Sequence, residues 1–318
     1  MNIFDFLIVK PFAFILRTIY DLVGSYGLAI IIFTILSKLI ILPLTVKGKK
    51  GMAKTQKLQP KLKALEEKYK NDKQKYQEEM AKLYQQEGVS PMSGCLPTLL
   101  TLPIMMGLYW PISQPLKHLM NLTAEQITEI TTRLGMSTEN MMLSEISVAQ
   151  SIFENFEKVK DISPNIIPIN MNFLGINLGA TPSFTTFDAL FLIPIISGLT
   201  SLLMTKVTTA MQERLTGTPS TNQNSMMTWM SPMLSVWIGF SLPAGLGLYW
   251  IISNVVAIIQ EVLLTMYMEK VYEKEAALEA EKQARLEAEK QAKKERLKEK
   301  YAAEEAKRAN GKNNRGNR

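Results

Sequence analysis

The sequence predicts an all-α integral membrane protein, a bundle of five transmembrane helices with a cytoplasmic helical hairpin and a basic C-terminal helical tail. Five stretches of the chain are almost free of charge and long enough to cross a bilayer as helices. Most of the 36 Lys and Arg residues lie in two blocks between and after these stretches. The alternating ten-residue strands of a membrane barrel do not occur in the sequence. Helices therefore have to satisfy the backbone hydrogen bonds within the hydrocarbon.

The first element is predicted from six apolar residues within segment 1–25. They recur at helical intervals with polar residues on the opposite face, and they are Phe12, Ile15, Leu16, Ile19, Leu22 and Val23. We interpret the segment as an amphipathic helix that lies in the membrane interface. The alternative is a first turn that only extends the following span. Asp5 precedes any basic residue, which is atypical of a cleavable signal peptide.

The other boundaries follow the alternation of apolar and charged segments. Transmembrane helices are expected at residues 26–45, 94–113, 187–208, 226–243 and 245–268. Between them lie a hairpin at 46–91, a long segment at 114–186 and a short loop at 209–225, and the basic tail occupies 269–318.

Loop charges predict the orientation of the chain. Residues 46–90 hold twelve Lys and six acidic residues, and the tail from residue 269 holds fifteen basic and eleven acidic residues. Residues 114–186 hold four basic and seven acidic residues. Because basic loops stay in the cytoplasm, the hairpin and the tail are expected inside, and the N-terminus and segment 114–186 outside.

Local signals predict helices within the segments outside the membrane. Asn71 and Asp72 form a turn or helix cap between the two arms of the hairpin. Residues 123–126 (TAEQ) have the form of a capping box. The tail is expected to form one solvated helix supported by Glu–Lys pairs, because its eight-residue repeat does not sustain a coiled-coil seam. The hairpin is either a charged connector or a docking surface, and the tail either a solubilising extension or a ribosome tether.

Lys38 is the leading candidate for a functional residue. It stands alone inside the first apolar stretch, where a charge costs roughly 2.5–3.5 kcal/mol on insertion scales, so it is expected to face protein, water or a substrate. Thr34 and Thr45 share its helix face, and Trp250, Asn254 and Glu261 share a face of the last span. Lys38 is either paired with Glu261 inside the bundle, or unpaired and facing a groove open to the cytosol.

The sequence does not predict an enzyme. No Walker A, GxSxG or HExxH motif occurs, and the chain has one Cys and one His, so we expect no cofactor, no metal and no catalytic residue. A small secondary transporter or channel, in which Lys38 binds an anionic solute, is the main alternative. Five unequal spans without an internal repeat argue against it.

An ordered series of motifs resembles the YidC/Oxa/Alb membrane protein insertase family, in its short bacterial form. The motifs span roughly residues 20–268, and they are 38–45 (KLIILPLT), Met52, 59–61 (QPK), Tyr69, 81–84 (AKLY), 88–91 (GVSP), 94–97 (GCLP), 102–104 (LPI), 108–109 (LY), 247–250 (GLYW), 253–254 (SN) and Gln260. Lys38 stands where the family usually has an arginine. Positive charge is kept there, but the planar fork of Arg is lost.

The resemblance implies an insertase and chaperone of membrane proteins that acts without hydrolysing nucleotide. Its client would enter a hydrophilic, positively charged groove that is open to the cytosol. We expect this groove to involve Lys38, Thr34, Ser37, Thr101, Trp250 and Asn254, and client recruitment to involve Met52, Gln59, Pro60, Tyr69 and Tyr84 of the hairpin. Expected partners are nascent membrane proteins, the ribosome through the tail, the Sec translocon and anionic lipids, at the bacterial plasma membrane.

Overall fold

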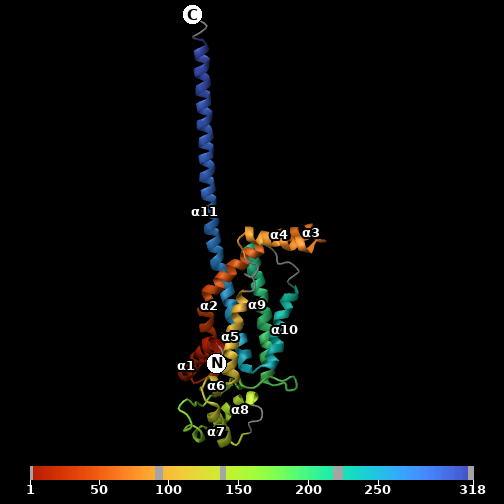
Figure 1. The fold of residues 1–318 in the computed structure, drawn as a ribbon, viewed down its shortest axis with the longest axis vertical. Helices are drawn as coiled ribbons and strands as arrows, with labels where there is room; N and C mark the ends of the chain where they lie inside the picture. Colours follow the sequence, from red (N-terminus) through yellow and green to blue (C-terminus); the bar gives the residue numbers. More distant parts are fainter. Residues whose placement is uncertain (1–2, 90–95, 137–140, 218–224, 314–318) are drawn as a thin grey trace. The chain divides into compact units, whose positions relative to one another are not determined.

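The protein is mostly helical, as Figure 1 shows for this computed structural model. The structure describes residues 3–89, 96–136, 141–217 and 225–313. These residues belong to two compact units, Met1–Leu264 and Thr265–Arg318.

The chain begins with a π-helical turn, η1 (Asp5–Val9), that leads directly into helix α1 (Lys10–Val23). Gly24 ends α1 in the left-handed region at φ +65°, and Ser25 is extended, so α1 is separate from the next helix. The alternative that this segment extends the first span is therefore wrong. The predicted apolar face of α1 is not buried along its whole length, because Leu16 is fully buried whereas Leu22 is 81% exposed.

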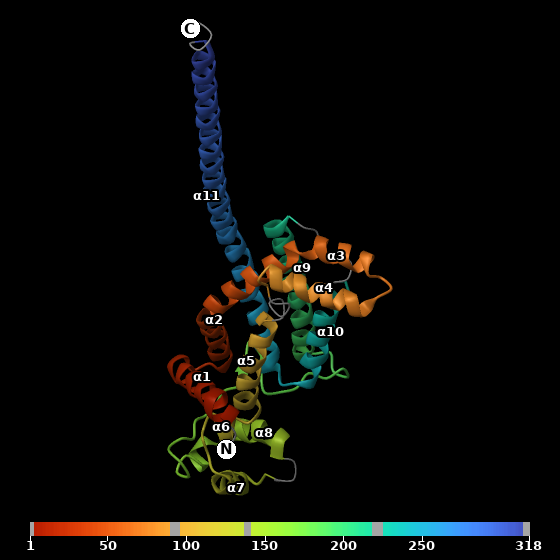
Figure 2. The same cartoon turned by 45° about the horizontal axis from the view of Figure 1, so that its top comes forward.

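Helix α2 (Tyr26–Lys57) continues well past the predicted end of the span at residue 45. Residues 46–57 are mostly good helix formers, so the helix persists after the apolar stretch stops. Pro43 lies inside α2, and the ribbon changes direction between the two halves of the helix (Figure 2). Prolines are the usual cause of such bends, because they remove a backbone donor.

The cytoplasmic hairpin predicted from the sequence falls on the end of α2 and on two short helices. Helix α3 (Gln59–Lys68) has Pro60 in its first turn, and helix α4 (Lys73–Gln86) lies beside it (Figure 1 and Figure 2). The Asp72 side chain accepts a hydrogen bond from the Lys75 amide at 3.0 Å. The helix cap predicted at this position is confirmed.

The next helix, α5 (Leu96–Ser113), carries no charged residue and leads into a segment of short elements. These are α6 (Pro115–His118), α7 (Ala124–Arg133), α8 (Met141–Glu154), η3 (Phe156–Lys158), and the antiparallel strands β1 (Asn172–Phe173) and β2 (Ile176–Asn177). At the start of α7, the side chains of Thr123 and Gln126 each bond the other residue's backbone amide. The predicted capping box is confirmed.

The core of the first unit joins this segment to the helices. Fully buried side chains come from α1, α2, α5 and the residues that follow α5. The Tyr20 hydroxyl donates to the carbonyl of Pro168 at 2.8 Å and accepts from the amide of Asn170 at 3.1 Å. Arg17 reaches the carbonyls of Leu119 and Asn165, both at 3.1 Å. Helix α1 is thus bound to segment 114–186 by hydrogen bonds that the spacing of its apolar residues does not predict.

A short 3-10 turn, η4 (Ala189–Phe191), precedes α9 (Leu192–Thr216), which packs closely against α10 (Ser225–Ser241). Small residues allow this approach, as is common between helices in membranes. A methyl group added to Gly198 would meet Val236 Cγ2 at 2.3 Å. The hydroxyl oxygens of Ser197 and Ser235 lie 2.8 Å apart and form a buried hydrogen bond.

The last helix, α11 (Ala244–Asn313), begins in the first unit and ends in the second. The predicted end of a span at residue 268 is therefore not a helix end, because residues 269–309 contain no Gly or Pro. In the second unit, residues 280–296 of α11 are exposed throughout. Helix α11 continues to Asn313, and residues 314–318 lie outside the described residues.

Within the described residues, three helices are long and apolar enough to cross a membrane. They are Tyr26–Lys57, Ala189–Thr216 and Ala244–Lys274. Helices α5 and α10 are apolar but have 18 and 17 residues. A count of five transmembrane helices stays a prediction.

Candidate functional site

Lys38 lies in α2 between buried and exposed neighbours. Thr34 and Ser37 are buried and donate their hydroxyl hydrogens to carbonyls of their own helix, at 2.7 and 2.8 Å. Ile40 is 75% exposed. The Lys38 side chain is half-buried, and within the part of the chain that the structure describes its ammonium has no hydrogen-bond or ion-pair partner. A positive charge in this apolar helix is thus left available.

The backbone beside Lys38 is supported by a side chain from α11. Pro43 supplies no amide donor, and its ring crowds the carbonyl of Leu39 four residues earlier, so the helix is weakened directly after Lys38. Neighbouring helices commonly repair such turns in membrane proteins. Gln260 of α11 bonds the carbonyl next to that of Leu39, because its Nε2 donates to the Lys38 carbonyl oxygen at 3.3 Å.

The carboxylate of Glu261 is bound by Lys49. Lys49 Nζ lies 2.6 Å from Glu261 Oε1 and 3.1 Å from the Glu261 carbonyl oxygen. The side chains are 4% and 12% exposed, so this ion pair is largely withdrawn from solvent. A pair between Lys38 and Glu261, one of the two alternatives left open by the sequence, is not formed.

A second polar contact of α11 reaches α9. Asn254 Nδ2 donates to Thr200 Oγ1 at 3.2 Å. Trp250, one helical turn before Asn254, is half-buried. Because Gln260 and Glu261 contact α2 and Asn254 contacts α9, α11 ties together the three helices that are long enough to span a membrane. Among the described residues, no hydrogen bond joins Lys38 directly to Trp250 or Asn254.

The structure locates the other predicted residues without joining them into one site. Thr101 falls in α5, but its side chain lies outside the described residues. Met52 is half-buried near the end of α2, and Gln59 and Pro60 begin α3. Tyr69 follows α3, with Lys68 Nζ 5.2 Å and Lys75 Nζ 5.8 Å from the centre of its ring. Tyr84 is half-buried in α4.

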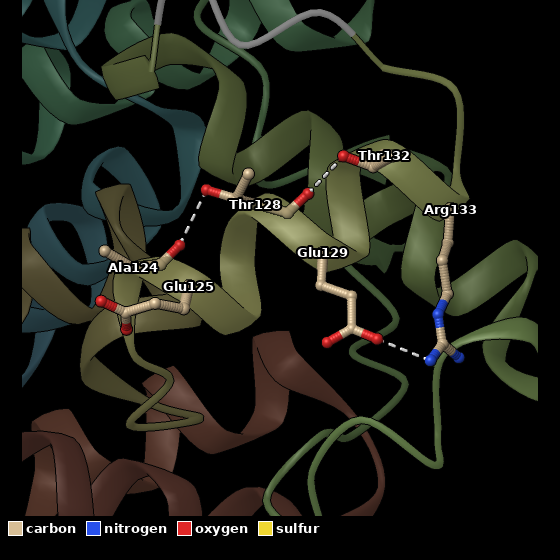
Figure 3. Close-up of a pocket in the computed structure, with 6 residues that line it drawn as sticks. All are labelled: Ala124, Glu125, Thr128, Glu129, Thr132 and Arg133. Atoms are coloured by element: carbon tan, nitrogen blue, oxygen red, sulfur yellow. Dashed lines mark hydrogen bonds and ion pairs between the residues drawn. The ribbon is translucent and has the colours of Figure 1, made fainter.

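A shallow depression of about 600 Å³ lies elsewhere, along helix α7. It is lined by Ala124, Glu125, Thr128, Glu129, Thr132 and Arg133 (Figure 3). Its polar groups already have partners, because Arg133 bonds Glu129 at 2.6 Å and Asp161 at 2.8 Å. The two threonine hydroxyls donate to carbonyls of their own helix. We assign no function to this surface.

The sequence analysis did not predict that Lys49 is a buried partner of Glu261, because it was treated as one of many surface lysines of the hairpin. Two signals were present. Gly48 and Ala53 are small, and Ala53 stands four residues after Lys49 on the same helix face, which lets another helix approach. Gln260 was visible as a polar residue in the last span, but nothing in its position identified the Lys38 carbonyl as its partner.

The chain is similar to known proteins over most of its length. The sequence model of the family described as 60Kd inner membrane protein matches residues 18–273. A Fusobacterium nucleatum protein named "Membrane protein insertase YidC" is 31% identical over 255 residues, which cover 80% of this chain and 93% of that protein. A Francisella philomiragia protein of the same name is 28% identical over 260 residues, which cover 82% of this chain.

The extent of the match differs between relatives. This chain matches 36% of the length of the Francisella protein, and therefore little more than a third of it. A solved structure titled "Active YidC insertase crystal structure with the first transmembrane domain resolved" aligns with a TM-score of 0.47 and 24% identity. That alignment covers 81% of this chain and 46% of the other.

Proposed function

The chain belongs to the 60Kd inner membrane protein family, the family of the YidC insertases, and from this membership we propose that it inserts client proteins into a membrane and assists their folding. The observation that carries the proposal is Lys38, a half-buried residue whose ammonium has no hydrogen-bond or ion-pair partner within the described residues. A charge in such an apolar helix costs roughly 2.5–3.5 kcal/mol. A client that carries negative charge would offset this cost during its passage.

The proposed architecture has five transmembrane helices around a groove that opens to the cytosol. The predicted segments at 94–113 and 226–243 supply the two spans beyond the three that are long enough by themselves. The groove is formed around Lys38 with Thr34, Ser37, Thr101, Trp250 and Asn254. The N-terminus lies outside the bacterial plasma membrane and the basic tail inside it.

In the proposed mechanism, a hydrophilic segment of the client enters the groove and contacts water and Lys38 instead of hydrocarbon. The apolar helix of the client then moves into lipid, gaining roughly 25 cal/mol for each Å² of apolar surface removed from water. The energy comes from this transfer, so the chain needs no nucleotide of its own. The helix bend at Pro43 and the Gln260 contact hold Lys38 in place.

The hairpin and the tail are proposed to bring clients to the groove. Met52, Gln59, Pro60, Tyr69 and Tyr84 belong to the recruiting surface, and exposed lysines around them attract acidic partners and anionic lipid headgroups. The tail attracts ribosomal RNA through its positive charge. A Sec translocon is a further proposed partner.

The experiment is insertion of a single-span client with an acidic translocated tail into proteoliposomes that contain the purified protein. We expect Lys38→Ala to slow insertion strongly, and Lys38→Arg to keep it, because the charge is retained. Lys206→Ala, an exposed lysine of α9, is the matched control. Normal insertion by Lys38→Ala would contradict the electrostatic role, and uptake of a small anion without any client insertion would favour a transporter.

A further inference from the structure

We propose that Lys49 is a specificity-determining residue of the groove, because it holds the Glu261 carboxylate and thereby keeps Lys38 available to a client. The inference rests on the proposed function and adds to that function the residue that keeps the groove positively charged. Lys49 does not need to touch the client to have this effect. It acts through Glu261.

The charges of the two helices make the need for such a residue clear. Lys38 is the single charged residue in residues 26–45, and Glu261 is the single acidic residue in residues 244–264. Opposite charges attract strongly where water is scarce. Without Lys49, the proposal expects the Glu261 carboxylate to pair with the Lys38 ammonium. Such an ion pair has no net charge and would not attract an acidic client.

The geometry places Glu261 near Lys38. Gln260, the residue directly before Glu261, bonds the Lys38 carbonyl oxygen at 3.3 Å. The proposal requires that the Lys38 ammonium, on its long and flexible side chain, can reach the Glu261 carboxylate once Lys49 is removed. Lys49 lies eleven residues after Lys38, about three helical turns, and thus on the same face of α2. In the proposal, both lysines compete for this carboxylate.

Lys49 contacts both the carboxylate and the backbone carbonyl of Glu261 in a nearly closed site. Its ammonium binds Oε1 of Glu261 at 2.6 Å and the Glu261 carbonyl at 3.1 Å. Because Lys49 is 4% exposed, water screens this pair little. The pair also joins α2 to α11, so a purely structural role is the alternative that an experiment has to separate.

A second-site substitution separates the two roles. In Lys49→Met, the Glu261 carboxylate loses the Lys49 ammonium, and the proposal expects it to pair with Lys38. In Lys49→Met/Glu261→Gln, the ion pair between the helices is equally absent, but no carboxylate remains to neutralise Lys38. A structural role requires the double variant to stay defective, whereas sequestration of Glu261 requires it to recover.

The experiment measures insertion into proteoliposomes of two clients that differ only in an acidic or a neutral translocated tail. We expect Lys49→Met to lower insertion of the acidic client about fivefold relative to the neutral one, the effect of a charge interaction of ordinary strength. The double variant should regain the wild-type ratio. Lys206→Met, which removes an exposed lysine of α9 outside the hairpin, is the matched control and should keep that ratio.

A second measurement needs no client. Acylation of Lys38 by an amine-reactive reagent, read by mass spectrometry of the purified protein in micelles, should be slower in Lys49→Met and normal in the double variant. Lys49→Gln replaces Lys49→Met if the latter does not accumulate, with the same expected direction. A wild-type protein that inserts neither client rejects the proposed function, while Lys38 reactivity still tests the role of Lys49.

Three results would overturn the inference. The first is equal Lys38 reactivity in wild type and Lys49→Met. The second is a double variant as defective toward the acidic client as Lys49→Met. The third is an equal loss with both clients, since a change in charge has to distinguish an acidic tail from a neutral one.

Discussion

Glu261→Gln isolates the energetic contribution of the buried ion pair between α2 and α11. The substitution keeps the size and a hydrogen-bonding side chain but removes the negative charge opposite Lys49. The Lys49 ammonium, 4% exposed, then remains in a site closed to solvent without its counter-charge. Breaking a buried pair in this way typically costs about 3–5 kcal/mol.

The structure places the expected loss at the lower end of that range. The Glu261 carbonyl oxygen stays 3.1 Å from Lys49 Nζ, and the new amide oxygen can still accept a hydrogen bond. We therefore expect a loss of about 3 kcal/mol in the free energy of unfolding. The assay is unfolding in mixed micelles by increasing denaturing detergent, followed by tryptophan fluorescence.

A second ion pair of the same chain provides the control. Lys61 Nζ lies 2.5 Å from Glu87 Oε1, but these side chains are 59% and 36% exposed. Exposed pairs contribute about 0–1 kcal/mol, so Glu87→Gln should change stability little. If both substitutions cost the same, burial does not govern the Lys49–Glu261 pair, and the reasoning is refuted.

Three further substitutions test the fold around the proposed groove. Tyr20→Phe leaves one carbonyl and one amide of segment 114–186 without their hydroxyl partner, so it should lower the free energy of unfolding by about 1–3 kcal/mol in the same micelle assay. An unchanged unfolding midpoint would contradict the docking of α1 against segment 114–186. Gly198→Leu should separate α9 from α10, because even a Cβ there meets Val236 at 2.3 Å, and weaker crosslinking between cysteines placed on the two helices would show it. Burial raises the pKa of Glu145 above its ordinary 4.5, despite hydrogen bonds from backbone amides of segment 114–186, so the stability that Glu145 contributes is present below pH 4.5 and is lost as pH rises through the raised pKa. Glu145→Gln should therefore make the melting temperature depend less on pH in that window. An unaltered pH profile would exclude Glu145 as the cause.

Much of the local structure could be predicted because the signals are local. The caps at Asp72 and Thr123 depend on side chains that bond backbone groups three residues away. The three helices long enough to cross a membrane follow from the length of apolar stretches. The ordered motifs from residue 38 to residue 260 predicted the family, and the match over residues 18–273 confirms it.

Helix ends were less predictable. Helix α2 extends to Lys57 because a helix does not stop where hydrophobicity stops. It stops where the backbone meets a residue that disfavours it, such as Pro60 in the first turn of α3. Helix α1 showed helical spacing, but its spacing did not predict that Arg17 and Tyr20 bind carbonyls more than 100 residues away.

The sequence alone determined that one lysine stands inside an apolar helix and one glutamate near the end of another. It did not determine whether they meet. Only the tertiary structure decided that, because the bend at Pro43 and the approach of α11 bring Lys49 to Glu261 and leave Gln260 beside Lys38. Helical periodicity places residues on a face, but which of two lysines on one face binds a carboxylate depends on how the helices are bent and packed.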